Sequence, residues 1–129
     1  MSQTLTTSSI SNYLCSDKWK ILFSDSNLAY GKQLARSRRV EKCKAEYLST
    51  EEIEIVSYVS DKSDHLYETV IVLWLEDGEI QIDASCSCSI QSNCMHCVAT
   101  IEYLIRGERL AIALGETPHL ETVTREKSD

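Results

Sequence analysis

The sequence contains few of the residues that make flexible or membrane-spanning chains. Its 129 residues include one proline and four glycines, so no long flexible linker is expected. No apolar run approaches the roughly 20 residues of a transmembrane helix, and no membrane association is expected. The first 17 residues contain no apolar signal-peptide core. We therefore expect an intracellular, cytoplasmic protein, in which disulfide bonds are rare.

Positive charge is also scarce. Lysine and arginine number 13 against 20 aspartates and glutamates, and the net charge of −7 opposes binding of nucleic acid over the whole surface. Segment 36–44 is the exception, with a local charge of +4 that leaves −11 for the remainder. If DNA binds, we expect the phosphate contacts to come from the basic residues of this segment: Arg36, Arg38, Arg39, Lys42 and Lys44. A protein partner is favoured over DNA, and no small-molecule substrate is expected.

Two motifs of catalytic proteins are missing. The chain has no GxxxxGK(S/T) loop, so it cannot hydrolyse ATP as P-loop proteins do. It also lacks the HxE motif with which zinc-dependent deaminases activate water, because neither His65 nor His96 has a glutamate two residues later. We expect a protein that is not an enzyme. The alternatives are a zinc-dependent enzyme and a purely structural cap on a neighbouring domain.

Cysteine is the residue that this sequence concentrates. Cys86 and Cys88 stand one residue apart, and Cys94 and His96 follow after a five-residue polar gap. In an extended segment, two residues with one residue between them point to the same side, so both cysteines can reach one ion. Asn93 can cap a helix that begins near Cys94. Three thiolates and one imidazole complete the tetrahedral ligand set of a structural zinc ion, with no open position for catalysis. We therefore predict one structural Zn²⁺ per chain.

Other uses of these cysteines are less favoured. Two cysteines one residue apart cannot form a disulfide without strain, and the cluster is too dense for one activated cysteine with a distant histidine. Cys97 is a rival of His96 as the fourth ligand, but on a helix it projects about 100° away and is interpreted as core. Cys15 and Cys43 are also interpreted as core residues, and His65 is not expected to be a ligand.

Hydrophobic periodicity predicts the order of the elements. We expect helices over residues 12–23, 28–37, 94–106 and 108–114, and strands over residues 40–48, 52–60, 67–75 and 80–85. Residues 1–12 are expected to be a mobile N-terminal segment, residues 13–115 the zinc-binding domain, and residues 116–129 a C-terminal tail or linker. Helix 94–106 has an apolar stripe that it can bury on the sheet.

The Asp77-Gly78 pair predicts a two-residue hairpin turn. The resulting register pairs Leu75 with Ile80, Leu73 with Ile82 and Ile71 with Ala84, which puts these residues on one face and leads the chain directly into Cys86. The predicted fold class is α+β: a small antiparallel meander of about four strands, with N-terminal helices and a C-terminal helix joined to the sheet by the zinc site. The opposite face, which carries Trp74, is a candidate partner surface if no helix covers it.

The spacing CxC, a gap and then CxH before an apolar helix resembles the SWIM-type zinc finger. The resemblance spans residues 23–115 and is closest to the N-terminal SWIM domain of bacterial helicase-like Swi/Snf ATPases. It includes Phe23, Leu28-Ala29-Tyr30-Gly31, the basic segment, and Asp77-Gly78-Glu79-Ile80. Three positions depart from the pattern: Tyr30 stands where arginine is usual, no glycine precedes the first strand, and Cys97 occupies an aliphatic position. The resemblance implies DNA binding or protein–protein contact by a module accessory to a helicase-like or DNA-processing machine.

Overall fold

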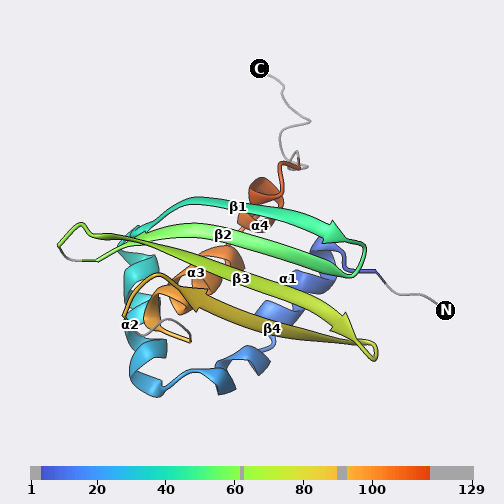
Figure 1. Cartoon of the computed structure of the whole chain (residues 1–129), viewed down its shortest axis with the longest axis horizontal. Coiled ribbons are helices and arrows are strands. Elements are labelled where there is room, and N and C mark those ends of the chain that lie inside the picture. The colour runs from blue at the N-terminus through green and yellow to red at the C-terminus, as the bar shows by residue number, and fades with distance from the viewer. Residues whose placement is uncertain (1–3, 62, 90–92, 117–129) are drawn as a thin grey trace.

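The chain folds into four strands and a set of helices that precede and follow them (Figure 1). The computed structural model describes residues 4–61, 63–89 and 93–116. The elements are α1 (Thr7–Cys15), the 3₁₀ helix η1 (Lys18–Leu22), α2 (Asp25–Arg36), β1 (Val40–Ser49), β2 (Glu52–Ser60), β3 (Leu66–Glu76), β4 (Glu79–Cys86), α3 (Met95–Ile105) and α4 (Arg109–Ala113). The predicted α+β class is confirmed. Across the described ranges, no helix is both long enough and apolar enough to cross a bilayer.

The four strands form one antiparallel sheet in the order β1-β2-β3-β4. The predicted hairpin register is confirmed, with Leu75 opposite Ile80, Leu73 opposite Ile82 and Ile71 opposite Ala84. Asp77 and Gly78 both adopt positive φ, as a primed two-residue turn requires. In β1 the register shifts between Glu41 and Lys44, and Lys42 has a φ of 50° there. This bulge lies in the edge strand, where such irregularities are common.

The core lies between one face of the sheet and the helices. Alternate residues of β2 and β3 are fully buried on this face, including Ile53, Ile55, Ile71 and Leu73. The helix α3 lies across the sheet and contacts all four strands, and α2 and α1 pack against α3 (Figure 1). The helices therefore cover the inner face. Of the apolar stripe predicted on α3, Ile105 is partly buried and the other members are buried there: Cys97, Val98, Ile101 and Leu104.

A cluster of three buried hydroxyls joins α3 to the sheet. Ser57 of β2 and Thr69 of β3 share a hydrogen bond of 2.7 Å, and both bond to the hydroxyl of Thr100. Thr100 also donates to the carbonyl of His96 at 3.3 Å. All three side chains are fully buried, so their hydroxyls depend on one another for hydrogen bonds. The cluster fixes the position of α3 along the sheet, close to the first turn of that helix.

The N-terminal helix differs from the prediction. It begins at Thr7 rather than residue 12, and it ends at Cys15, after which Asp17 adopts a left-handed φ of 70° and η1 follows. Thr6 caps the helix through a capping box with Ser9, and Ile10 is fully buried. The segment 1–12, expected to be mobile, thus contains the first residues of α1. Residues 1–3 lie outside the described ranges, and so do residues 117–129 of the predicted tail.

Candidate metal centre

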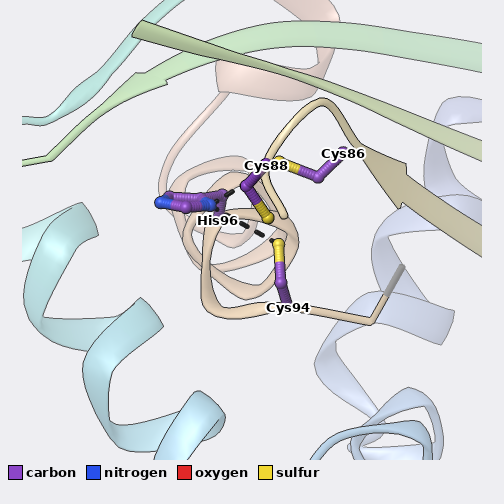
Figure 2. Close-up of side chains that lie close together, drawn as sticks. All are labelled: Cys86, Cys88, Cys94 and His96. Atoms are coloured by element: carbon purple, nitrogen blue, oxygen red, sulfur yellow. Dashed lines mark hydrogen bonds between the residues drawn. The ribbon is translucent and has the colours of Figure 1, made fainter. Parts of the chain in front are cut away.

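Two ends of secondary structure meet at the Cys/His cluster. Cys86 is the last residue of β4 and Cys88 follows it, whereas Cys94 is the N-cap of α3 and His96 lies in its first turn. All four side chains are buried, and each is at most 8% exposed. Figure 2 shows the two cysteines from the strand side and the two residues from the helix side pointing toward one another. Four ligand atoms from these residues lie within 4.8 Å of one another.

Two sulfur–nitrogen separations match those of a tetrahedral site. For Zn–S bonds of about 2.3 Å and a Zn–N bond of about 2.05 Å, tetrahedral geometry separates sulfur from nitrogen by about 3.6 Å. The Nδ1 atom of His96 lies 3.6 Å from Cys86 Sγ and 3.5 Å from Cys94 Sγ (Figure 2). Cys86, Cys88, Cys94 and His96 could therefore hold a metal ion, with Nδ1 as the imidazole ligand atom. The histidine nitrogen involved is not evident from the sequence.

Backbone contacts hold the two ends of the cluster in place. The amide of Ser87 donates to the Glu68 carbonyl, and the Ser87 hydroxyl accepts from the Glu68 amide, both at 2.9 Å, which ties the segment after β4 to β3. On the other side, the Asn93 amide donates to the Ala84 carbonyl at 3.3 Å. Asn93 was expected to cap α3, but it adopts a left-handed φ of 52° and the N-cap is Cys94. Both ends of the site are therefore anchored to the β3–β4 hairpin.

The thiols of the cluster differ in acidity when no metal is bound. Hydrogen bonding with the side chains of Cys86 and Cys97 lowers the pKa of Cys94. Hydrogen bonding to Cys94, together with burial, raises the pKa of Cys86 and of Cys97. Cys94 is thus the first of these three thiols to ionise. A divalent cation in the cluster must displace the protons that remain, since the thiolate is the metal-binding form.

Cys97 lies outside the group of converging ligand atoms. It is fully buried, and its sulfur donates to the Ser85 carbonyl at 3.4 Å. The Sγ atoms of Cys94 and Cys97 are 4.0 Å apart. The remaining cysteines are distant in the fold: Cys15 is exposed at the end of α1, and burial raises the pKa of Cys43 on β1 to about 12. His65 also lies outside the group.

An aromatic ring supports the His96 imidazole. Tyr67 of β3 stacks on His96, with ring centroids 4.5 Å apart and planes at 26°. The Tyr67 hydroxyl donates to Asp61 at 3.2 Å, and His65 stacks on Tyr67 with a centroid separation of 5.9 Å. The contacts around the imidazole therefore extend to the loop between β2 and β3. The alternation in the sequence predicts for Tyr67 only the start of a strand.

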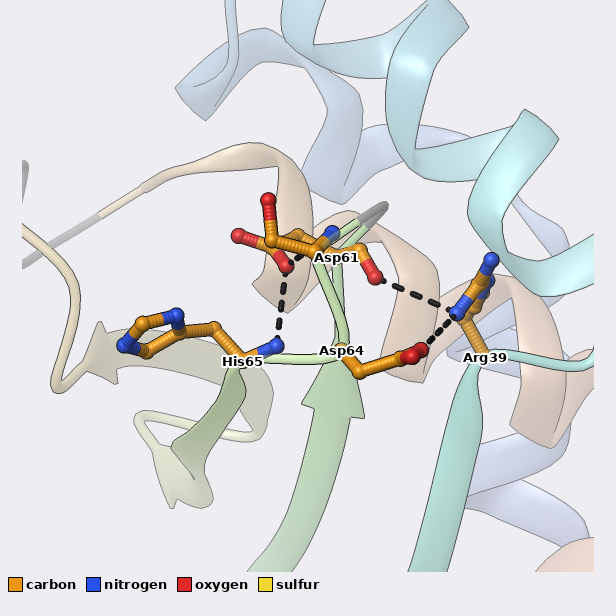
Figure 3. A network of polar contacts seen from close by, with 5 residues as sticks. Arg39, Asp61, Asp64 and His65 are labelled. Atoms are coloured by element: carbon orange, nitrogen blue, oxygen red, sulfur yellow. Dashed lines mark hydrogen bonds and ion pairs between the residues drawn. The ribbon is translucent and has the colours of Figure 1, made fainter.

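Asp61 organises that loop (Figure 3). Its carboxylate accepts hydrogen bonds from the amides of Ser63 at 2.8 Å and His65 at 3.0 Å. Burial opposes its ionisation, but these amides and the Tyr67 hydroxyl outweigh that effect and lower the pKa of Asp61. Arg39 donates to the Asp61 carbonyl at 3.1 Å and forms a salt bridge of 3.0 Å with Asp64 (Figure 3). The loop is thus held against the start of β1.

The five basic residues of segment 36–44 occupy different surroundings. Arg36 is exposed in the last turn of α2, and Arg38 is exposed in the connection to β1. Arg39 is engaged with the β2–β3 loop, Lys42 is at the bulge of β1, and Lys44 pairs in register with Val56 of β2. The segment therefore runs from a helix end along an edge strand.

Comparisons with known protein families, with curated proteins and with solved structures found no match to this chain. The candidate function consequently depends on the residues and the geometry described above.

Proposed function

We propose that the protein is a zinc-binding, SWIM-type module that mediates protein–protein contact and has no catalytic activity. One observation carries the proposal: three cysteines and a histidine in the order CxC, gap, CxH place their ligand atoms within 4.8 Å of one another in a buried site. Two sulfur–nitrogen separations are close to those of tetrahedral zinc. The same order precedes an apolar helix in SWIM domains. Four protein ligands complete a closed site, which supports a structural rather than a catalytic ion.

The position of the site explains what the ion would contribute. When bound, zinc would link the end of β4 to the first turn of α3 and would add its binding free energy to folding. Cys86 and Cys88 would hold it from the sheet, and Cys94 and His96 from the helix.

A protein partner is favoured over DNA by charge. The net charge is −7, and of the five basic residues in segment 36–44 one already forms a salt bridge. The resemblance to SWIM domains of helicase-like ATPases suggests that the partner belongs to such a helicase-like or DNA-processing machine. DNA contact through Arg36, Arg38, Arg39, Lys42 and Lys44 stays a prediction.

The zinc part of the proposal is tested by metal analysis and unfolding. Protein purified without added chelator should contain one zinc per chain by inductively coupled plasma mass spectrometry. Cys88→Ser should lose the zinc and most of the cooperative thermal transition, because structural zinc contributes folding energy directly. Cys15→Ser is the matched control, since Cys15 is exposed on α1, and it should keep both. A Cys88→Ser protein with full zinc content and full stability would overturn the assignment.

The choice between partner classes is tested by fluorescence anisotropy with labelled single- and double-stranded DNA, at low and at physiological salt. We expect no binding at physiological salt. Binding that weakens steeply with salt and disappears in Arg36→Glu/Arg38→Glu would instead assign the module to nucleic acid. Arg36 and Arg38 are chosen because both are exposed and neither takes part in an ion pair among the described residues.

A further inference from the structure

The sheet has a second face that α1, α2 and α3 do not cover, and α4 borders it only at the edge strand β1. We call it the outer face; it alternates along each strand with the buried inner face. Its centre is an apolar strip of Val56, Val70, Val72 and Trp74, which are partly exposed and do not join the core cluster. The strip is contiguous, because Val56 lies opposite Val70 and β3 supplies the other members at alternate positions. In Figure 1, α1, α2 and α3 lie on the other side of the strands, and α4 lies at the β1 edge.

Acidic residues surround the strip. Strand pairing and alternation place on the outer face one lysine, Lys44, and eight carboxylates: Glu41, Glu46, Glu52, Glu54, Glu68, Glu76, Glu79 and Asp83. Glu46 and Glu54 lie directly opposite one another, which is an unfavourable cross-strand pair. The two ion pairs found among the described residues, Lys20–Asp17 and Arg39–Asp64, both lie elsewhere. Negative charge on this face is therefore not balanced within the described chain.

A hollow beside Trp74 adds a specific feature. It has a volume of about 530 Å³, and Val72, Trp74 and Leu75 form its apolar part while Glu51, Glu52 and Asp83 line its acidic part. An apolar floor with carboxylates at the rim suits a lysine or arginine side chain, which buries its aliphatic stem and keeps its charged end among anions. The indole ring of Trp74 offers a further attraction to a cation above its face.

We propose that the outer face binds a lysine- and arginine-rich amphipathic segment of a partner protein. The apolar side chains of that segment would cover the strip, and its cationic side chains would pair with the surrounding carboxylates and enter the hollow beside Trp74. This inference rests on the protein-interaction part of the proposed function and specifies its surface and the chemistry of its partner.

Charge excludes the other occupants. Nucleic acid and anionic membranes carry the same sign as the face. A second copy of the chain would bring an equally acidic face, so like charges would repel. The chain's own residues 117–129 carry Arg125 and Lys127 against Glu121, Glu126 and Asp129, and so lack a positive excess.

The test uses a fluorescein-labelled 14-residue peptide that repeats Leu-Lys-Lys-Leu, titrated with the full zinc-loaded chain. The variant Glu52→Gln/Glu54→Gln/Asp83→Asn should weaken binding by about tenfold or more, because it removes three carboxylates beside the strip. The control Asp25→Asn/Glu102→Gln/Glu108→Gln removes the same charge from the helical side and should change binding by less than about twofold. Trp74→Gln should also weaken binding, while a peptide with serine in place of leucine should bind less tightly to the wild-type chain.

Two outcomes would overturn the inference. One is that the two triple variants weaken peptide binding equally, which would mean that the peptide is attracted by the overall negative charge of the chain and not by the outer face. The other is a set of peptide-induced amide shifts in ¹H–¹⁵N spectra that falls on the helices instead of β2, β3 and β4. Zinc content is measured on every variant. If every variant holds one zinc per chain but the outer face does not bind the peptide, only the inference about the outer face is wrong. If the wild-type chain holds no zinc, the proposed function is wrong whether or not the peptide binds.

Discussion

His96 and Cys97 are neighbours in the sequence but face different surroundings. The His96 Nδ1 atom points at Cys86 and Cys94, whereas the Cys97 sulfur donates to a backbone carbonyl. We predict that His96→Ala loses the bound metal and that Cys97→Ala retains one zinc per chain, with a loss of stability of about 1–2 kcal/mol from the missing buried sulfur. Zinc analysis and chemical denaturation of both variants check this. A Cys97→Ala protein without zinc would make Cys97 the fourth ligand.

The affinity for zinc should depend on pH. The hydrogen bond with Cys94, together with burial, raises the pKa of Cys86 and so favours the protonated thiol in the metal-free protein. Zinc must displace that proton, and the affinity should therefore rise about tenfold per pH unit for each proton released and fall as pH decreases. Competition with a chromophoric chelator between pH 6 and pH 8 measures the slope. An affinity that does not change with pH would show that the thiols are already ionised.

At the scale of single residues, the sequence predicts the candidate metal ligands better than it predicts the side chains that pack against them. The spacing of Cys86, Cys88, Cys94 and His96 is local, so strand and helix geometry alone indicate that they can share an ion. The contact between Tyr67 and His96 depends on how β3 lies over α3. That arrangement follows from packing of the whole core, and no spacing in the sequence encodes it.

At the scale of elements, α2 and α3 approach closely at Gly31. A Cβ atom added at this position would lie within 3.0 Å of the Val98 side chain and the Met95 carbonyl. We predict that Gly31→Ala destabilises the fold by about 1–3 kcal/mol, although alanine is the better helix former by about 1 kcal/mol. Lys32→Ala, one residue further along and exposed, should have little effect. Urea denaturation of both variants measures the difference, and a Gly31→Ala protein at least as stable as the wild type would contradict the close approach.

The hydroxyl cluster of Ser57, Thr69 and Thr100 is the polar link between the sheet and α3. Thr100→Val keeps the shape of the side chain but removes its hydrogen bonds to Ser57 and Thr69. We expect a loss of about 1–3 kcal/mol, because two buried hydroxyls lose a partner. Thr50→Val, at an exposed turn, is the control and should be nearly neutral. Equal stability of the two variants, measured by thermal unfolding with zinc present, would show that the cluster contributes nothing to the position of α3.

Strands were predicted from the sequence more accurately than helix ends. Alternation in β2 and the Asp77-Gly78 turn determine both register and face, since a slip of one residue would expose Ile53, Ile71 and Leu73. The start of α1 was missed because Leu5, which precedes the helix, and Ile10, within it, are separated by a run of serine and threonine. That run reads as irregular chain, yet Thr6 and Ser9 form a capping box. The cap of α3 was placed one residue early because Asn93 is the better capping residue by type.

At the scale of the whole molecule, the distribution of charge and the candidate metal site lie in different regions of the protein. The net charge of −7 can be read from the sequence, but its concentration on the outer face emerges only when the four strands are aligned. The same alignment brings the end of β4 to the start of α3 and so closes the candidate metal site at one end of the helix. The buried side chains of the inner face stabilise the fold, and the outer face is the proposed surface for a partner protein.

In the proposed metal site, three sulfurs and one nitrogen bind zinc. X-ray absorption at the zinc edge measures these ligands and their distances directly. For the purified chain, we predict three sulfur atoms at about 2.3 Å and one imidazole nitrogen at about 2.0–2.1 Å from the metal. Four sulfurs, with Cys97 in place of His96, would contradict the ligand set. A shell of oxygen and nitrogen atoms, as in an exposed or adventitious site, would contradict the zinc module as a whole.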